Sequence, residues 1–401
     1  MYDVNLYYFL YPFAGIISII GIILKKEKIT YSFLAFLLTI LAVFKFDHGY
    51  DYFWYWIVGD KSLVNHSEVV KIYTNLEYGV KIIYNVVRYL GYSQYFFIIT
   101  GLIISYYIYK TLKRDSKLPL ISLILFLIIE MGFVDFNFYI MQSLGMSIIF
   151  YYTHYILEKQ KIKFMLIVIL CSFLFHRSNI IALSYLLIPQ RKIRVSEYFL
   201  EIIIVFIFFK YLFQKLVIKI LPQYNYLFYF NKNLVMANME NIKMFIILLI
   251  IIIGIYFLKK MKLKEIKKIE LDKNEQFYCN IFIMGLILTI MFAKVFGGDL
   301  SKRIGSYFLF FGYITFGNVI FFLKKEILKY IKILLVIFFV LLRMFLMIKW
   351  DIAYYLNRQP YINKNGDLIA RPNSKGLRLF FGKKYEDMSP YLPGENRFYK
   401  D

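Results

Sequence analysis

Long apolar runs separated by short polar segments dominate the pattern along this 401-residue chain. The clearest are "LYYFLYPFAGIISIIGIIL" (6–24), "FIILLIIIIGIYFL" (245–258) and "ILLVIFFVLL" (333–342). A helix needs roughly 20 mainly apolar residues to cross the hydrocarbon core of a bilayer, and many of these runs meet or approach that length. The pattern predicts an all-α, polytopic transmembrane protein with about 11–12 membrane segments.

The predicted membrane segments share this apolar character and are 6–24, 31–46, 95–109, 118–133, 137–157, 164–189, 198–220, 243–258, 277–296, 304–323 and 331–348. The first is not preceded by a basic stretch or followed by a small-residue cleavage site, so we expect a retained helix rather than a signal peptide. No internal repeat typical of a duplicated transporter fold is visible in the sequence.

Short segments rich in Lys and Arg separate many of these runs and predict which helix ends face the cytoplasm. They are 25–28, 110–117, 158–163, 190–194, 259–268 and 324–332. The other connections should face outward, together with the N-terminus: 47–94, 134–137, 221–242 and 297–303. We expect one transmembrane catalytic domain, residues 1–349, with a large outer loop, 47–94, and a polar tail, 350–401, on the outer face.

The run 164–189 has basic segments at both ends, so a single crossing would place one of them outside. Its centre, "FHRSN" (175–179), contains ionisable side chains, and Ser178 or Asn179 could cap a helix there. Non-helical backbone at membrane depth is tolerated only where protein or a water-filled cavity surrounds it. We therefore predict a broken or re-entrant helix with His176 and Arg177 at its outer tip.

Composition supports the membrane class and excludes several others. The chain is 60% hydrophobic, whereas soluble proteins are nearer half. The net charge of +23 comes from lysines that lie between spans, so it reflects topology and not nucleic-acid binding. Cys171 and Cys279 lie inside apolar segments, which argues against a disulfide framework. The histidines lack metal-ligand spacing, and we expect neither a metal nor a cofactor.

The predicted topology gathers polar residues from distant segments at the outer face. They are Asp47, His48, Asp51, Glu77, Gln142, His176, Arg177 and Arg303. Charges near a bilayer are costly and are often functional, and arginine binds phosphate or carboxylate in a bidentate way. Structural alternatives stay open: the two aspartates solvate a helix end, Glu77 favours a helix start, and Gln142 forms a hydrogen bond between helices.

Five short motifs follow one another in a recognisable order: "KFDHGYDYFWY" (45–55), "EYG" (77–79), "MQSLGMSI" (141–148), "LFHRSNII" (174–181) and "KRIGSYFLF" (302–310). This order resembles the EpsG-like branch of the Wzy-type polysaccharide polymerases, with the pattern R-x-x-x-G-x-D-Y, E-x-G/Y-G/F, R-Q-x-x-A, F-H-x-S and R-x-x-x-Y-F. The resemblance covers about 45–310 and departs at two positions. Lys45 and Met141 stand where the family pattern has arginine, and Arg177 is a candidate substitute.

The resemblance implies a multi-pass glycosyltransferase of the bacterial inner membrane that polymerises O-antigen, capsule or exopolysaccharide. Its substrate would be an undecaprenyl-diphosphate-linked oligosaccharide, joined to a second lipid-linked unit at the outer face. Its partners would be membrane lipid, a chain-length regulator and a flippase. A diphosphate leaving group needs cations, and an acceptor hydroxyl needs a base. The expected catalytic residues are Asp51, His176 and Glu77, and the expected substrate-binding residues are Arg303, Arg177, Lys45, Gln142, Tyr52 and Asp47, with Trp54 and Tyr55 available to stack on sugars.

Two other classes share the span count and the basic connections. A lipid-linked oligosaccharide flippase or polysaccharide transporter should show a central polar cavity and pseudo-symmetric halves. A membrane acyltransferase should place a histidine-based site on the cytoplasmic or mid-membrane side, where only His154 is expected. Polymer formation from lipid-linked repeat units, without an acyl donor or a second compartment, separates the polymerase from both alternatives.

Overall fold

The computed structural model describes residues 6–46, 52–129, 132–191, 272–296, 298–323, 325–356 and 378–379. Nearly all of them are helical, which confirms the all-α prediction. The exception is a two-residue antiparallel pairing of β1 (Lys45–Phe46) with β2 (Arg378–Leu379). The predicted segments 198–220 and 243–258 lie outside the described residues.

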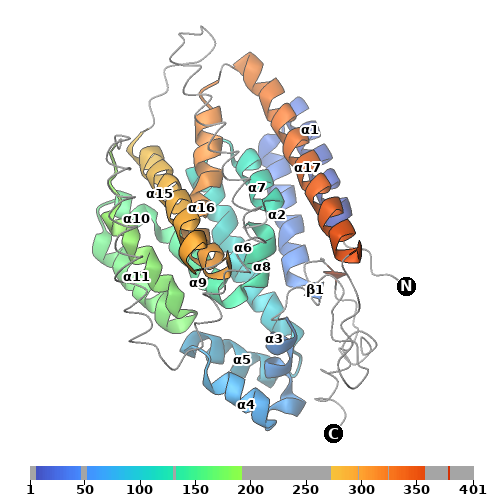
Figure 1. Cartoon of the computed structure of the whole chain (residues 1–401), viewed down its shortest axis with the longest axis vertical. Coiled ribbons are helices and arrows are strands. Elements are labelled where there is room, and N and C mark those ends of the chain that lie inside the picture. The colour runs from blue at the N-terminus through green and yellow to red at the C-terminus, as the bar shows by residue number, and fades with distance from the viewer. Residues whose placement is uncertain are drawn as a thin grey trace.

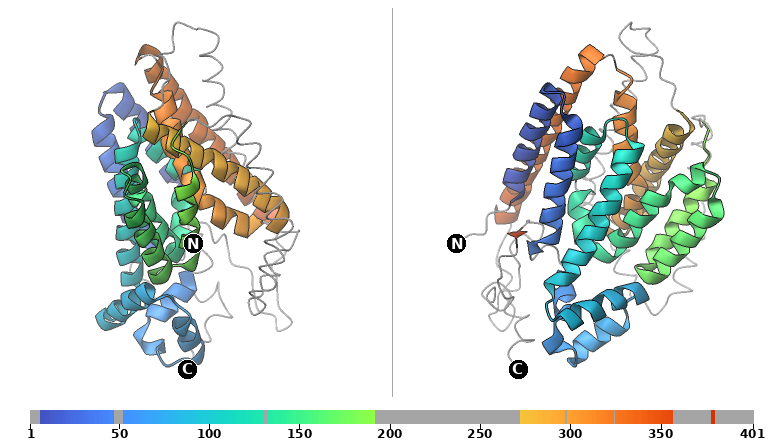
Figure 2. Two further views of the ribbon diagram at one scale, coloured as in Figure 1. Left: turned by 90° about the vertical axis from the view of Figure 1, so that its left-hand side faces the viewer. Right: turned by 180° about the vertical axis from the view of Figure 1, so that it is seen from behind.

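The longer helices run side by side along the length of the molecule (Figure 1 and Figure 2). They include α1 (Tyr7–Ile23), α2 (Glu27–Val43), α6 (Gln94–Asp115), α9 (Ile140–Tyr152) and α11 (Lys161–Leu174). In the described part of the chain, Gln94–Asp115 and Ile327–Met347 are long and apolar enough to cross a membrane. Tyr7–Ile23 and Pro119–Ile128 are shorter apolar helices, and together these features are those of a helical membrane protein.

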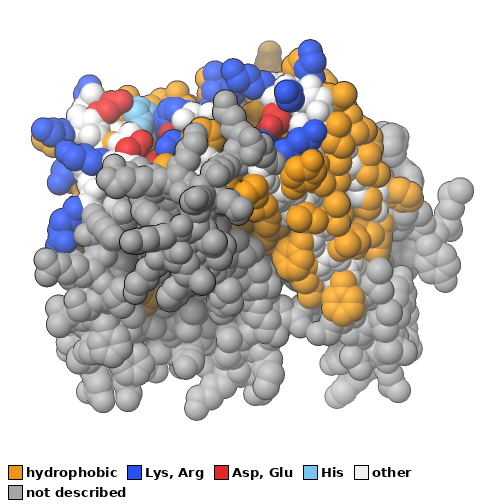
Figure 3. All heavy atoms as spheres, turned by 90° about the horizontal axis from the view of Figure 1, so that it is seen from above, with side chains coloured by type: hydrophobic (Ala, Val, Ile, Leu, Met, Phe, Trp, Pro, Cys, Tyr) orange, Lys and Arg blue, Asp and Glu red, His pale blue; other side chains and the backbone are white. Residues whose placement is uncertain are grey.

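One end of the bundle gathers the basic connections after α1, α6, α10 (His154–Leu157) and α16 (Gly298–Ile320), and we call it the lysine-rich end. Contacts between distant segments hold it together. Arg114 lies 2.8 Å from His154, and the Lys117 backbone N–H donates to Asn318 Oδ1 at 2.6 Å. Figure 3 looks onto this end and shows Lys and Arg side chains across it. The basic segments that the structure describes therefore share one end, as the charge pattern predicted.

The opposite end, which we call the α5 end, carries four short helices. These are α3 (Tyr52–Gly59), η1 (Lys61–Leu63), α4 (Ser67–Thr74) and α5 (Tyr78–Leu90). They occupy the predicted loop 47–94, so this segment is far more structured than its composition indicated. The helix α5 buries Val80, Tyr84 and Val87, spaced as one face of a helix.

The polar segment 134–137 is not the outward connection that the sequence predicted. After α7 (Pro119–Ile128), the chain forms the short helix α8 (Phe133–Phe138) inside the core. Asp135 and Asn137 are only 5% and 4% exposed. The ammonium of Lys45 donates to Asn137 O at 2.8 Å and to Asn137 Oδ1 at 3.1 Å, which offsets the cost of burying Asn137 and Lys45.

The predicted break in 164–189 is present in the structure. The helix α11 ends at Leu174, and after Phe175 and His176 the chain continues as η2 (Arg177–Leu187), a 3₁₀ helix packed on α11. The cap is His176 itself, whose Nδ1 accepts from the backbone N–H of Ser178, rather than Ser178 or Asn179. The buried side chains of η2 recur every third residue, as three residues per turn require: Asn179, Ala182 and Tyr185.

The last helices pack as a hairpin and a long outer helix. They are α15 (Lys273–Phe296), α16 and α17 (Lys325–Leu356). The helix α16 begins at Gly298, so most of the predicted connection 297–303 is helical and Arg303 lies in the first turns of α16. The helix α17 contacts α1 and continues past the predicted start of the tail at residue 350.

Candidate functional site

At the α5 end, α9 is joined to the start of α16 through Gln142. Its amide Nε2 donates to the backbone oxygen of Arg303 at 2.8 Å and lies 3.4 Å from Ser306 Oγ. Ser306 Oγ also donates to the Arg303 oxygen, at 2.8 Å. The guanidinium carbon of Arg303 lies 4.7 Å from the ring centre of Tyr139, a cation–π distance. Gln142 therefore forms the interhelical bond considered above, and in doing so it fixes the turn that carries Arg303.

A second chain of hydrogen bonds connects His176 to α16. His176 Nδ1 lies 2.6 Å from Ser178 Oγ, which lies 2.9 Å from the hydroxyl of Tyr307. The Tyr307 hydroxyl donates to Asn179 Oδ1 at 2.8 Å, and the Tyr185 hydroxyl donates to the Tyr307 backbone oxygen. Tyr307, Asn179 and Tyr185 are all fully buried, so this network is rigid.

The hydrogen bonds of His176 define what its ring can do. A backbone N–H only donates, so Nδ1, which accepts from Ser178, carries no proton, and the neutral ring has its hydrogen on Nε2. The charges of Arg303 and Arg177 lie close enough to act on the ring electrostatically. In this arrangement His176 presents a hydrogen-bond donor, and Nδ1 is already engaged.

The "EYG" segment brings Glu77 to the same place. Glu77 is the residue before α5, and the neighbouring Tyr78 ring stacks on Phe173 with centres 4.8 Å apart. Gly79 packs against the end of α11, where a Cβ would lie 2.7 Å from the Leu174 backbone oxygen. Only glycine allows this approach, so the motif sets the start of α5 beside the turn that carries His176.

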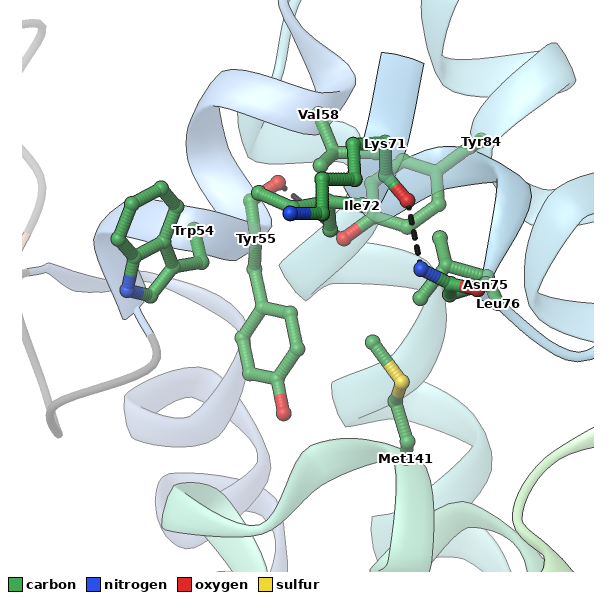
Figure 4. Close-up of a pocket in the computed structure, with 9 residues that line it drawn as sticks. All are labelled: Trp54, Tyr55, Val58, Lys71, Ile72, Asn75, Leu76, Tyr84 and Met141. Atoms are coloured by element: carbon green, nitrogen blue, oxygen red, sulfur yellow. Dashed lines mark hydrogen bonds between the residues drawn. The ribbon is translucent and has the colours of Figure 1, made fainter. Parts of the chain in front are cut away.

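A cavity of about 570 Å³ opens between α3, α4, α5 and α9 (Figure 4). It is lined by Trp54, Tyr55, Val58, Lys71, Ile72, Asn75, Leu76, Tyr84 and Met141. Burial raises the pKa of the Tyr84 hydroxyl well above its usual value, so the hydroxyl stays protonated and donates to Tyr55 O at 3.2 Å. Because Met141 precedes Gln142, the cavity borders the polar cluster and presents aromatic surface to it.

Sequence reasoning missed Asp135, a buried carboxylate next to this cluster. Together with Tyr139, Gln142 and Ser306 it lines a small cavity of about 10 Å³, room for roughly one water molecule. A buried ionisable group is costly and is a candidate for function when it faces a cavity. The available signal is a lone acid within the largely apolar stretch "FVDFNF" (133–138), which includes the predicted connection 134–137.

The other predicted site residues divide into three groups. Lys45 and Tyr52 are 1% exposed and belong to the scaffold here, where the Tyr52 hydroxyl donates to Gln94 Oε1 at 3.2 Å and its ring stacks on Phe97. Arg177 is exposed at the start of η2. The predicted residues Asp47, His48 and Asp51 lie outside the described residues.

The described residues contain no group of three or more His, Cys, Asp or Glu side chains placed to hold a metal ion. Cys171 and Cys279 are buried and are not in a disulfide. The chemistry that the described cluster offers is therefore that of arginine, amide, imidazole, hydroxyl and carboxylate groups around an aromatic cavity.

Comparison with curated proteins and with solved structures finds no significant match. The sequence profile of the EpsG family matches residues 28–363, a range that contains all five motifs and every element of the cluster just described. This match confirms the resemblance drawn from the motifs. The family is similar to the Wzy-type polysaccharide polymerases. The chain belongs to the EpsG family.

Proposed function

We propose that the chain is a polysaccharide polymerase of the bacterial cytoplasmic membrane. It joins undecaprenyl-diphosphate-linked oligosaccharide repeat units at the outer face, in the synthesis of O-antigen, capsule or exopolysaccharide. The observation that carries the proposal is the convergence of Gln142, His176 and Arg303 beside an aromatic cavity, at the end opposite the lysine-rich connections. Membership of the EpsG family supports a glycosyltransferase-like polymerase.

In this reaction an acceptor sugar hydroxyl attacks the anomeric carbon of the donor. The bond from that carbon to the diphosphate breaks, and undecaprenyl diphosphate leaves with the electron pair. Arg303 and Arg177 bind the diphosphate and stabilise the charge that develops on it. Because Gln142 and Ser306 hold the backbone of Arg303, this arginine is positioned before substrate arrives.

The proton of the acceptor hydroxyl needs a base. Since Nδ1 of His176 is engaged, we assign this role to a carboxylate: Asp135, Glu77 or Asp51. His176 then donates from Nε2 to a substrate oxygen, which is a positioning contact. The aromatic rings of Trp54 and Tyr55 line the cavity, and we assign to them the sugar-stacking role expected from the sequence.

The test in cells is the length distribution of the surface glycan made by an Arg303→Ala variant. We expect the long-chain ladder to collapse to single repeat units, with Arg303→Lys restoring only part of it because lysine lacks the bidentate fork. A matched control is Arg114→Ala, whose guanidinium pairs with Asp115 at the lysine-rich end, away from the cluster and the cavity. A normal ladder from Arg303→Ala at normal protein level would show that Arg303 is not needed for polymerisation.

The test with purified components separates the proposed polymerase from a flippase or an acyltransferase. Detergent-solubilised protein is incubated with lipid-linked repeat units, without an acyl donor and without vesicles. Polymer of more than one repeat unit supports the proposal. Repeat units that remain unjoined while the protein is folded would reject it.

A further inference from the structure

A second, larger cavity of about 840 Å³ opens at the lysine-rich end. It lies between the connection from α1 to α2 and the connection from α6 to α7, far from the polar cluster at the α5 end (Figure 1). The charged residues of its lining are five lysines and one glutamate: Lys25, Lys26, Lys28, Lys113, Lys117 and Glu27. We propose that this cavity binds the phosphate headgroup of an anionic phospholipid whose acyl chains lie along α1 and α2.

The single acid of the cavity does not neutralise its lysines. Glu27 Oε1 lies 2.5 Å from Nζ of Lys332 on α17, a lysine outside the lining. On the other side, Lys117 pairs with Glu275 of α15, so its charge is balanced. These two ion pairs tie the cavity walls to α15 and α17 and leave the remaining lysines as the source of its positive potential.

Those remaining lysines come from both walls and are exposed to solvent. Lys25 and Lys28 flank the start of α2, and Lys113 stands on the last turn of α6. Lys26, the N-cap of α2, is exposed as well, and among the described residues none of these four ammonium groups lies within 4.0 Å of a carboxylate oxygen. A phosphate group between the walls would contact lysines from two connections at once, because each of its two non-bridging oxygens can accept from a different ammonium group.

Two helix starts add to the field of the lysines. The first turns of α2 and α7, at Glu27 and Pro119, both line the cavity. The N-terminal N–H groups of a helix carry partial positive charge and favour an anion nearby. The cavity therefore combines mobile ammonium groups with fixed backbone dipoles, as phosphate sites often do.

The apolar surface beside the cavity argues for a lipid and not for a soluble phosphate. Ile29 lines the cavity and is 64% exposed, and Phe33 and Phe36 follow it on the same face of α2. On α1, Phe13 lies across from Phe33, with ring centres 6.5 Å apart. Figure 3 shows hydrophobic side chains on a flank that borders the Lys and Arg side chains of this end. A headgroup among lysines with acyl chains on an adjoining apolar stripe is the arrangement expected of a lipid site.

The test uses the purified full-length protein in detergent and measures lipid retention by native mass spectrometry. Dioleoyl phosphatidylglycerol is the probe and dioleoyl phosphatidylcholine is the zwitterionic comparison. The variant replaces Lys25, Lys28 and Lys113 with Gln, and we expect it to bind phosphatidylglycerol roughly tenfold or more weakly. The matched control replaces three lysines at the same end but outside the cavity, Lys159, Lys161 and Lys163, with Gln, and should bind as the wild type does.

Three results would overturn the proposal. Equal weakening in the cavity variant and in the control would show that only overall charge matters. Retention of phosphatidylcholine equal to that of phosphatidylglycerol would show that the net negative charge of the headgroup does not determine binding. Phosphatidylglycerol that still binds as tightly as in the wild type after Ile29→Ser and Phe36→Ser, and is displaced by inorganic pyrophosphate, would assign the site to a soluble phosphate. Loss of phosphatidylglycerol, but not of pyrophosphate, in that apolar variant supports a lipid.

Discussion

The hydroxyl of Tyr307 is the link between His176 and α16, and removing it tests the site with minimal change in shape. In Tyr307→Phe the ring keeps its place, but two contacts disappear: the bond donated to Asn179 Oδ1 at 2.8 Å and the contact with Ser178 Oγ at 2.9 Å. A buried acceptor left without its hydrogen-bond partner costs about 1–3 kcal/mol, so we expect a loss of that size. Asn179 is 0% exposed, and its unpaired oxygen places the expected cost in the upper half of that range.

The same substitution should affect catalysis more than stability. Ser178 would lose its anchor on α16, and His176, which bonds to Ser178 at 2.6 Å, would lose its fixed orientation. Misplacement of a positioning group by about 1 Å lowers rates by up to about 100-fold, and we expect a fall of roughly 10- to 100-fold in the initial rate of polymer formation.

Two assays on one protein preparation check the prediction. The unfolding midpoint in detergent reports stability, and polymer formation from lipid-linked repeat units reports activity. Tyr31→Phe is the control, because Tyr31 is a buried tyrosine at the lysine-rich end whose hydroxyl donates to Tyr109 O at 2.6 Å. It should lose stability and keep its rate. If both variants polymerise equally fast, the link from Tyr307 to His176 has no part in the reaction.

Three further predictions use the same assays. Asp135→Asn should lower the polymerisation rate about 100-fold, because an amide cannot act as the base. Stability should not fall, because a buried charge is removed at nearly constant side-chain volume. An unchanged rate would exclude Asp135 as the base. Gly145→Val should destabilise the protein by about 1–3 kcal/mol, since a Cβ there would lie 2.0 Å from Asn179 Nδ2, and an unchanged unfolding midpoint would contradict this packing. Trp54→Ala should raise the substrate KM about tenfold, because a ring that stacks on the sugar is lost. Tyr89 is 87% exposed and lies outside the cavity, so Tyr89→Ala should leave KM unchanged. Equal KM values for the two variants would show that the cavity does not bind substrate.

Helix positions were predictable where a membrane imposes length and polarity. The apolar run 6–24 became α1 with a shift of one residue at each end, and the run 304–323 became α16, which begins earlier than predicted, at Gly298. The break near His176 was also visible, because ionisable side chains interrupt an apolar run that has basic flanks on both sides. These features are local, and a local pattern is enough to recognise them.

Features that depend on distant contacts were not predictable. The segment 134–137 reads as a connection because Asp135 and Asn137 interrupt an apolar run, yet both are buried, and Lys45, 92 positions earlier, bonds to Asn137. Asp135 was missed for the same reason. The helices within 47–94 were missed because their apolar faces are short and separated by polar residues.

The sequence predicted which residues of the candidate site lie together but not the contacts between them. Charge rules predicted that Glu77, Gln142, His176 and Arg303 share one end, and the structure places the four residues at the α5 end. The sequence did not show that Gln142 holds the backbone of Arg303, or that Nδ1 of His176 is already engaged. Those roles depend on hydrogen-bond directions, which only the fold defines.

The 3₁₀ geometry of η2 has a consequence for reach. Its eleven residues span about 22 Å at 2.0 Å per residue, roughly 5 Å more than the same residues in an α-helix. The three-residue period also keeps Asn179 and Tyr185 in line, so that one holds the hydroxyl of Tyr307 and the other its backbone oxygen. Winding η2 into an α-helix would retract His176 by about one helical turn and rotate Tyr185 away from Tyr307. The length of η2 and its hydrogen bonds to Tyr307 therefore depend on the same 3₁₀ geometry. Substitutions that favour α-helical geometry would change both at once.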